Sequence, residues 1–319
     1  MKKIISVLII IAFALTFTAA CSKPNAPVIG ISQYGEHASL DNCREGFIQG
    51  LLDNGLVEKE DFIIDYQNAG FDDDIATQIA QRFSANNVAM MCAVATPSAT
   101  ACFAAAEDKD IPVIFTAITD PVEAKLDKGN ITGTSDKLPV DAQLDLIRKL
   151  QPQAKTIGII YTTSEPNSIS AISEYQEKAP LYGFSIEAVG VMEQSEITLA
   201  ADNLIRKGVD CFSNLTDNNV VGVLPAILEK TDQVGIPVYG SEIEQVRLGC
   251  VASAGIDYFL LGRMTGAMAA KILKGEDTAA EMPYESITDF SYYINANALS
   301  RMGIVVPEDL AGQVIEAGE

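Results

Sequence analysis

Two stretches, PVIGISQ at residues 27–33 and KTIGIIY at residues 155–161, decide the fold of this 319-residue chain. The second is a fresh first strand of the same kind as the first, and short β-branched runs and amphipathic helical stretches alternate after each of them. Apolar strands that alternate with helices of about 10–15 residues predict βαβ units and parallel sheets with both faces covered. Because the pattern starts twice, we predict an α/β fold with two doubly wound parallel sheets rather than one large sheet.

The elements on either side of these two stretches follow the same alternation. The predicted strands are 28–31, 62–66, 88–94, 113–115, 156–161, 185–191, 211–214, 238–239 and 250–253. The predicted helices are 40–51, 73–85, 97–106, 140–150, 166–179, 196–206, 219–231 and 259–274. Gly275 follows the last of them, where a glycine commonly closes a helix.

The N-terminus has the features of a bacterial export signal. Lys2 and Lys3 are followed by an apolar run over residues 4–17. A run of that length fits a signal peptide and is too short to span a bilayer. We therefore expect residues 1–20 to be removed and the mature chain to work outside the cytoplasmic membrane.

The end of this signal resembles the lipobox of bacterial lipoproteins. Small residues over 18–20 precede Cys21, although Thr18 stands where Leu or Val is usual. A diacylglyceryl group on Cys21 would supply two acyl chains, which suffice for stable anchoring. The predicted location is the extracytoplasmic face of the cell membrane, with residues 21–27 as the tether. The alternative is ordinary cleavage near Ala20, which leaves Cys21 unmodified.

Composition limits the possible partners and chemistry. The chain has 43 acidic and 22 basic residues, a net charge of −21 that becomes −23 once Lys2 and Lys3 leave with the signal. So acidic a surface repels nucleic acid and anionic lipid, and neither is expected as a partner. Besides Cys21 there are five cysteines, none with metal-ligand spacing, and a single histidine. We predict buried thiols with at most one pairing, no metal and no cofactor.

Two such sheets create a cleft at the carboxyl ends of their strands, where open α/β sheets bind ligands. Polar residues follow six of the predicted strands at this edge, in both halves of the chain. They are Gln33, Tyr34, Glu36 and His37; Thr96 and Ser98; Thr119 and Asp120; Tyr161, Glu165, Asn167 and Ser168; Thr216, Asp217 and Asn218; and Ser241. We predict that they share one pocket. Specifically, Ser98, Tyr161 and Asp217 should line a common cavity.

Several motifs, in this order and spacing, resemble a known family. They are IGISQYGEHASLD, ATPSAT, IPVIFTAITDPVEA, ITGTSD, IGIIYTTSEPNS, TDNNVV, GIPVYGSE and GIDYFLLGRMTGAMAAKILKGE. Together they resemble the solute-binding lipoproteins of ABC importers whose better-known members bind tryptophan, tyrosine or phenylalanine. The resemblance covers nearly all of the mature chain. It implies a type I periplasmic-binding-protein fold, in which two lobes joined by three crossings close over one small solute. An ABC permease with its ATPase would then be the partner.

The resemblance also implies lobe boundaries and ligand roles. The N-terminal lobe would hold 28–136 and 254–282, and the C-terminal lobe 137–253 and 283–319. Thr96 and Ser98 would bind the carboxylate of an amino acid, helped by Thr119 and by Asn167 or Ser168. The ammonium would meet Asp217 first, with Glu165 and Asp120 as substitutes. Tyr34 and Tyr161 would hold an apolar or aromatic side chain between them.

Two further positions have more than one interpretation. His37 is either a pocket hydrogen-bonding group and pH-sensitive latch or a turn histidine bonded locally. Asp257 and Tyr258 form either a helix cap with hinge support or a ligand contact.

Other functions remain as alternatives. A ligand-sensing lobe of a membrane receptor would share the fold. An extracellular enzyme is disfavoured because the single His37 has no nearby nucleophile motif and cannot form a metal cluster. We therefore predict a binding protein and not an enzyme.

Overall fold

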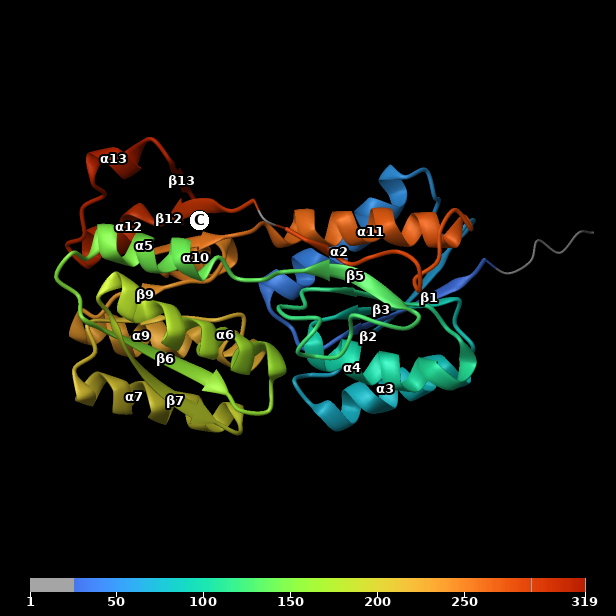
Figure 1. The fold of residues 1–319 in the computed structure, drawn as a ribbon, viewed down its shortest axis with the longest axis horizontal. Helices are drawn as coiled ribbons and strands as arrows, with labels where there is room; N and C mark the ends of the chain where they lie inside the picture. Colours follow the sequence, from blue (N-terminus) through green and yellow to red (C-terminus); the bar gives the residue numbers. More distant parts are fainter. Residues whose placement is uncertain (1–25, 288, 319) are drawn as a thin grey trace, which may run out of the picture.

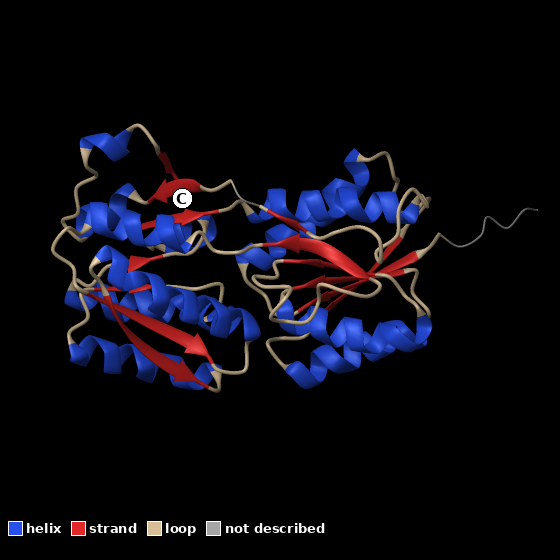
Figure 2. Ribbon diagram, viewed as in Figure 1, coloured by secondary structure: helices blue, strands red, loops and turns tan. Residues whose placement is uncertain are grey.

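The computed structural model describes residues 26–287 and 289–318, so the predicted export signal and Cys21 lie outside the described residues. The described chain forms two lobes, each with a sheet between layers of helices (Figures 1 and 2). Two doubly wound lobes are what the repeated strand pattern predicts, and this fold class is confirmed.

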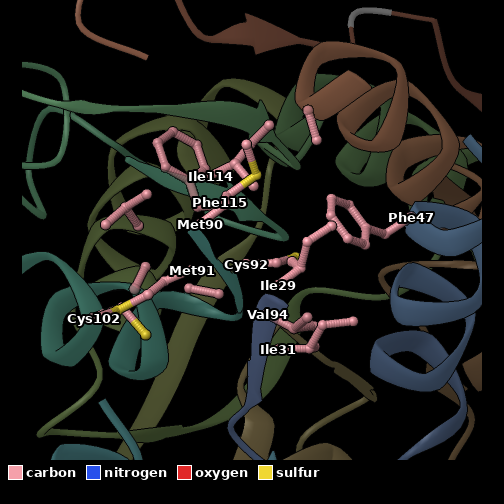
Figure 3. Close-up of a cluster of buried hydrophobic side chains, with 14 of the residues drawn as sticks. Ile29, Ile31, Phe47, Met90, Met91, Cys92, Val94, Cys102, Ile114 and Phe115 are labelled. Carbon is pink, nitrogen blue, oxygen red and sulfur yellow. The ribbon is translucent and has the colours of Figure 1, made fainter. Parts of the chain in front are cut away.

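The first lobe is built on a six-stranded parallel sheet with the order β11-β5-β4-β3-β1-β2. Its strands are β1 (Val28–Gln33), β2 (Ile63–Asn68), β3 (Met90–Val94), β4 (Val113–Thr116), β5 (Ile131–Ser135) and β11 (Glu285–Ser286). Every residue of β3 and β4 is buried. Their apolar side chains form the core of this lobe with those of β1, as Figure 3 shows.

Four helices cover the two faces of this sheet (Figure 1). They are α2 (Ala38–Asp53) and α11 (Tyr258–Leu273) on one face, and α3 (Asp73–Ala85) and α4 (Thr96–Ala106) on the other. Glycines allow α2 and α11 to approach closely, because a Cβ on Gly46 would lie 2.1 Å from the carbonyl oxygen of Phe259. A Cβ on Gly262 would likewise lie 2.0 Å from that of Cys43. Helix α11, which comes late in the chain, is thereby fixed to the N-terminal lobe.

The second lobe contains a four-stranded parallel sheet with the order β7-β6-β8-β9. Its strands are β6 (Thr156–Thr162), β7 (Ser185–Val191), β8 (Cys211–Ser213) and β9 (Val238–Tyr239). A bridge from Gly240 to Ser253 continues it into a mixed sheet of β10 (Ala252–Gly255), β12 (Ser291–Ile294) and β13 (Val314–Glu316). Helices α5 (Val140–Leu150) and α6 (Pro166–Lys178) pack into one core, and α7 (Ile197–Lys207) and α9 (Leu224–Val234) into another.

The chain crosses between the lobes three times: after β5, after β10 and after β11. Two crossings lie later than the sequence predicts. Residues 254–255 continue β10 in the second lobe, and 285–286 pair with β5 in the first sheet, so the expected boundaries at 253 and 282 shift by a few residues. Short strands at the edge of a sheet carry little pattern of their own, which explains the shift.

The predicted helix 219–231 is two helices in the structure, α8 (Asn218–Gly222) and α9. Pro225 lies in the first turn of α9, where its missing N–H costs nothing, while Val223 between the helices has left helical geometry. Strands β5, β11, β12 and β13 and helices α10 (Ile243–Leu248), α12 (Ala296–Arg301) and α13 (Glu308–Ala311) were not predicted.

The five cysteines within the described residues are all buried and unpaired. The predicted buried thiols are therefore confirmed, without the one optional pairing. Over the same residues, no helix is long and apolar enough to cross a membrane.

Candidate functional site

A small cavity of about 20 Å³ lies between the two lobes, where the carboxyl ends of both sheets face each other. Both lobes contribute to its wall. The lining residues are His37, Ser39, Leu40, Ala117, Asp136, Thr216, Asn218, Val221, Glu242, Gln245 and Tyr258. A space of this size holds about one water molecule. The lobes are thus in contact around it, and a larger solute enters only when they move apart.

Side chains of the two lobes bond directly to each other around this cavity. Ser39 of α2 donates to Glu242 at 3.0 Å, and Asn42 one turn later donates to Glu244 at 2.6 Å. The hydroxyls of Thr119 and Thr216 lie 2.9 Å apart. These contacts join segments that are distant in sequence, and they hold the two lobes together around the cavity.

The start of α2 forms one side of the cavity. Its first N–H groups have no partner within the helix, and His37 at the cap position supplies no side-chain bond to them. His37, Ser39 and Leu40 from this end of the helix all line the cavity. A helix N-terminus carries partial positive charge, so this side of the cavity favours an anionic group.

Asp136, at the end of β5, presents an unsatisfied carboxylate oxygen to the cavity. It is 3% exposed, and its Oδ2 accepts from the Tyr258 hydroxyl at 2.5 Å. Its Oδ1 is buried with no hydrogen-bond partner. Burial raises the pKa of Asp136 above the usual range of a carboxyl. A ligand cation beside Oδ1 would satisfy this oxygen and restore the charged form.

Glu242, before α10, lies on the opposite wall of the cavity. Its carboxylate accepts from the backbone N–H groups of Glu244 and Gln245, which caps α10. Burial raises the pKa of Glu242 well above its ordinary value, and the nearby Glu244 adds to this. The Oε2 atom of Glu244 is also buried without a partner. None of the residues described along this cavity is Lys or Arg. No basic side chain of the cavity wall therefore neutralises the carboxylates of Asp136 and Glu242.

Asp217 and Glu165 form a second carboxylate pair, with different surroundings. Asp217 is fully buried and accepts from the backbone N–H groups of Thr162 and Val220 and from the hydroxyls of Thr162 and Ser168. All of these donors belong to its own lobe. The expected ammonium role of Asp217 is therefore corrected: its lone pairs cap α8 and tie that helix to β6.

Glu165 is saturated in the same way. It accepts from the side chain of Asn167 and from the backbone and side-chain N–H groups of Asn218 and Asn219. Burial raises the pKa of Glu165 to about 8, and the charge of Asp217 contributes. With five donors around it, Glu165 has no free oxygen for a ligand in this arrangement.

Among the predicted site residues, His37, Thr216 and Asn218 line the cavity. Both ring nitrogens of His37 are buried without a hydrogen-bond partner, and burial lowers the pKa of His37 to about 4. Asn218 bonds to Glu165, and Thr216 meets Thr119 across the cleft. Asp120 accepts from Ser170 of the second lobe at 2.9 Å.

Other predicted residues lie close to the cleft without lining the cavity. Ser98 is buried and accepts from Ser32 at 3.3 Å, and Thr96 has a buried hydroxyl without a partner. Asn167 and Ser168 bond to Glu165 and Asp217. None of these four side chains lines the cavity.

The remaining predicted residues face elsewhere. Gln33 bonds to Asp41 and Arg44, Ser241 bonds to the carbonyl of Leu215, and Glu36 is exposed. Tyr34 is buried and donates to Asp73 at 2.9 Å.

Tyr161 packs against the core of the second lobe, beside Gly190 of β7. Ser98, Tyr161 and Asp217 thus do not line one cavity, and the expectation that they would is wrong. Successive side chains of a strand point to opposite faces of the sheet, so the side chain of Tyr161 points to one face of its sheet and not beyond the end of the strand.

Ser39, Asp136, Glu242 and Gln245 line the cavity without having been predicted as ligand contacts. Tyr258, for which a ligand contact was one of two interpretations, lines it as well. Asp136 follows β5 directly, in GTSD, and Glu242 comes three residues after β9, in YGSE, which is the same signal that selected their neighbours. The cap interpretation of Asp257 is confirmed, since its carboxylate accepts from the N–H groups of Phe259 and Leu260. No group of three or more potential metal ligands occurs among the residues that the structure describes.

This cleft between two α/β lobes defines the chain as a periplasmic-binding-protein-like solute-binding protein. Residues 28–317 match the family described as ABC transporter substrate binding protein. The chain therefore belongs to the ABC transporter substrate-binding proteins, a transporter component and not an enzyme class.

The most informative relatives bind aromatic amino acids. A tyrosine-binding protein of Clostridioides difficile is 34% identical over 94% of this chain and 92% of its own length. A structure from Streptococcus pneumoniae in complex with L-Trp is 32% identical, covers 92% of this chain and 100% of its own, and has a TM-score of 0.86.

A third relative shows the effect of lobe movement. The ligand-free, open structure of a substrate-binding protein with adhesive properties from Clostridium difficile is 35% identical over 91% of this chain and 99% of its own. Its TM-score is only 0.67. The present structure is thus closer in shape to the L-Trp complex, in agreement with its closed cavity.

Proposed function

We infer that this chain is the extracytoplasmic solute-binding lipoprotein of an ABC importer and that it captures an aromatic or large apolar L-amino acid between its lobes. The observation that carries this function is the polarity of the cavity. The N-terminus of α2 favours an anionic group, and the carboxylates of Asp136 and Glu242 line the same cavity without a basic partner. A zwitterion offers a group of the matching charge to each.

The carboxylate of the ligand would bind the free N–H groups at the start of α2, beside the neutral ring of His37. This assignment replaces the predicted Thr96 and Ser98, which lie outside the cavity wall. The ammonium would bind between Asp136 and Glu242. A charge-assisted hydrogen bond in a site closed to water contributes about 1.5–3 kcal/mol.

The ligand side chain would contact the apolar part of the wall. Leu40, Ala117, Val221 and Tyr258 supply it from both lobes. The two relatives that bind tyrosine and L-Trp support an aromatic side chain. Closure over such a ring would bury apolar surface on both lobes, at about 25 cal/mol per Å².

The placement outside the membrane rests on residues 1–21. A basic start, an apolar run and small residues before Cys21 support export and lipidation. The permease and its ATPase would receive the solute from the closed protein. Intact mass of the mature chain isolated from membranes tests the anchor: a diacylglyceryl addition on Cys21 supports it, and an unmodified Cys21 contradicts it.

The ligand is tested without assuming its identity by mass spectrometry of solute released from the purified protein. Titration calorimetry against the twenty L-amino acids then measures each affinity. We expect one-to-one binding of tyrosine, tryptophan or phenylalanine, with no conversion of the ligand. No heat with any amino acid would contradict the proposal.

A further inference from the structure

Phe71, in the turn between β2 and α3, has a backbone conformation that bulky residues rarely adopt. Its φ is +65°, directly after Gly70 at +63°. In this region the Cβ of an L-residue crowds its own backbone, and such strain persists only where the surroundings hold it. Tyr34 does so here, because its backbone carbonyl accepts from the N–H of Phe71 at 2.8 Å.

The strained backbone directs the ring of Phe71 over the first strand-end loop. The ring covers Gly35, where a Cβ would lie only 2.0 Å from it. It stacks on His37, with centroids 6.3 Å apart and planes at 5°, and meets the ring of Tyr34 edge-on at 6.0 Å. Since His37 lines the cavity, the ring lies directly behind the cavity wall of the first lobe.

The far edge of the same ring reaches the second lobe. A Cβ on Gly222, the last residue of α8, would lie 3.2 Å from Cζ of Phe71. It would also lie 2.7 Å from Nε2 of Gln194, which donates to the carbonyl of Asn219 in α8. The space that a side chain at position 222 would take is thus occupied by Phe71. Helix α8 is the element whose first residue, Asn218, lines the cavity.

We propose that Phe71 is an interlobe clasp, by which we mean a positioning residue whose ring packs against Gly222 when the lobes close. This contact sets how long the solute is retained. This inference rests on the proposed function and goes beyond it, because Phe71 is not part of the cavity wall. A contact made only in the closed form stabilises that form selectively. Its loss should therefore act on the dissociation rate more than on the association rate.

Replacing Phe71 tests the clasp by stopped-flow kinetics with L-tyrosine and L-tryptophan as probes. Phe71→Ala should raise the dissociation rate about tenfold and change the association rate less than about twofold. Phe71→Gly should do the same with an unfolding midpoint of the free protein equal to or higher than that of Phe71→Ala, since glycine adopts a φ of +65° without strain. Truncating Leu181, an 80% exposed residue of the second lobe, is the matched control and should change neither rate.

Gly222→Ala tests the position on α8 against which the Phe71 ring packs. A methyl group there would meet the Phe71 ring, so dissociation should accelerate in the wild-type background by about threefold or more. In the Phe71→Ala background the same change should have a clearly smaller effect, because the ring is gone and only Nε2 of Gln194 remains beside the new methyl group. An equal effect of Gly222→Ala in both backgrounds would overturn the clasp. An unchanged dissociation rate in Phe71→Ala would overturn it as well.

The failure of the proposed function has a different signature. If wild-type protein binds neither amino acid, that function fails, and the clasp is judged by small-angle X-ray scattering of the free proteins. The wild-type protein should then have a smaller radius of gyration than Phe71→Ala under the same conditions. Equal radii in that case would overturn the clasp.

Discussion

Two pairs of buried carboxylates lie at the edge of the cleft, and their surroundings differ. Asp217 and Glu165 accept hydrogen bonds from many donors of their own lobe. Asp136 and Glu242 lie across the cavity from one another, and Asp136 keeps a buried oxygen without any partner. A carboxylate whose oxygens all accept hydrogen bonds stabilises the fold. A carboxylate with a free oxygen at a cavity can bind a cation. The comparison assigns stability to the first pair and ligand binding to Asp136, while Glu242 both caps α10 and contributes to the acidic wall of the cavity.

Asp217→Ala should produce the largest effect, and on stability. It removes the acceptor for four donors at the junction of α8 and β6, and unsatisfied buried donors are costly. We expect the free energy of unfolding to fall by about 3 kcal/mol or more. Denaturant unfolding measures it, with Asp120→Ala as the control at less than about 1 kcal/mol. If Asp217→Ala lost affinity but no stability, the ammonium role predicted from the sequence would be restored.

Asp136→Asn and Glu242→Gln should act on affinity instead. Each keeps the size and acceptor oxygen of the side chain while removing the charge that would hold an ammonium. We expect each to weaken amino-acid binding by about 10- to 100-fold. The free energy of unfolding should change by less than about 1 kcal/mol in Asp136→Asn and by up to about 2 kcal/mol in Glu242→Gln, whose amide leaves one capped N–H of α10 without an acceptor. Calorimetry and denaturant unfolding on the same samples separate the two effects. Affinities that stay at the wild-type value would remove these residues from the site.

His37 should report closure through its own titration. Burial lowers its pKa to about 4 in the closed form, while an exposed histidine titrates near about 6.5. Because the neutral ring is favoured when the lobes are closed, this contribution to closure is present above pH about 6.5 and is lost as the pH falls toward about 4. As His37 is the only histidine of the chain, NMR follows it directly. The same pKa with and without bound amino acid would contradict this.

The hydrogen bond between Asn42 and Glu244 should contribute least. It lies 2.6 Å across the lobes, on a partly buried rim. Asn42→Ala should weaken binding by about three- to fivefold, as expected for one hydrogen bond near solvent. Calorimetry against Gln49→Ala, which changes a bond confined to α2 (Asp53), supplies the control. A loss as large as that of Asp136→Asn would mean that the rim, and not the cavity, carries the affinity.

The fold was predictable because its signal is repeated. PVIGISQ and KTIGIIY are buried central strands, where apolar runs with flanking turns carry the most information. The missed elements, such as β11 and β13, are two or three residues long and gain their structure from pairing with neighbours.

The site was predictable only in part, since strand ends indicate where a cleft lies but not which side chain keeps a free lone pair. Asp217 and Asp136 both follow strand-end sequences of the same kind. What separates them is the set of donors that other segments bring, such as Thr162 and Ser168 around Asp217. Such tertiary contacts have no local sequence pattern.

The most direct measurement of the proposed zwitterion site compares two ligands that differ in one group. Calorimetry measures the affinity of wild-type protein for L-tyrosine and for 3-(4-hydroxyphenyl)propanoate, which lacks the ammonium. The difference between the two affinities is the contribution of the ammonium group at the acidic wall. We expect one-to-one binding of L-tyrosine and an affinity for the second compound that is weaker by about 100-fold or more. Equal affinities for the two compounds would contradict it.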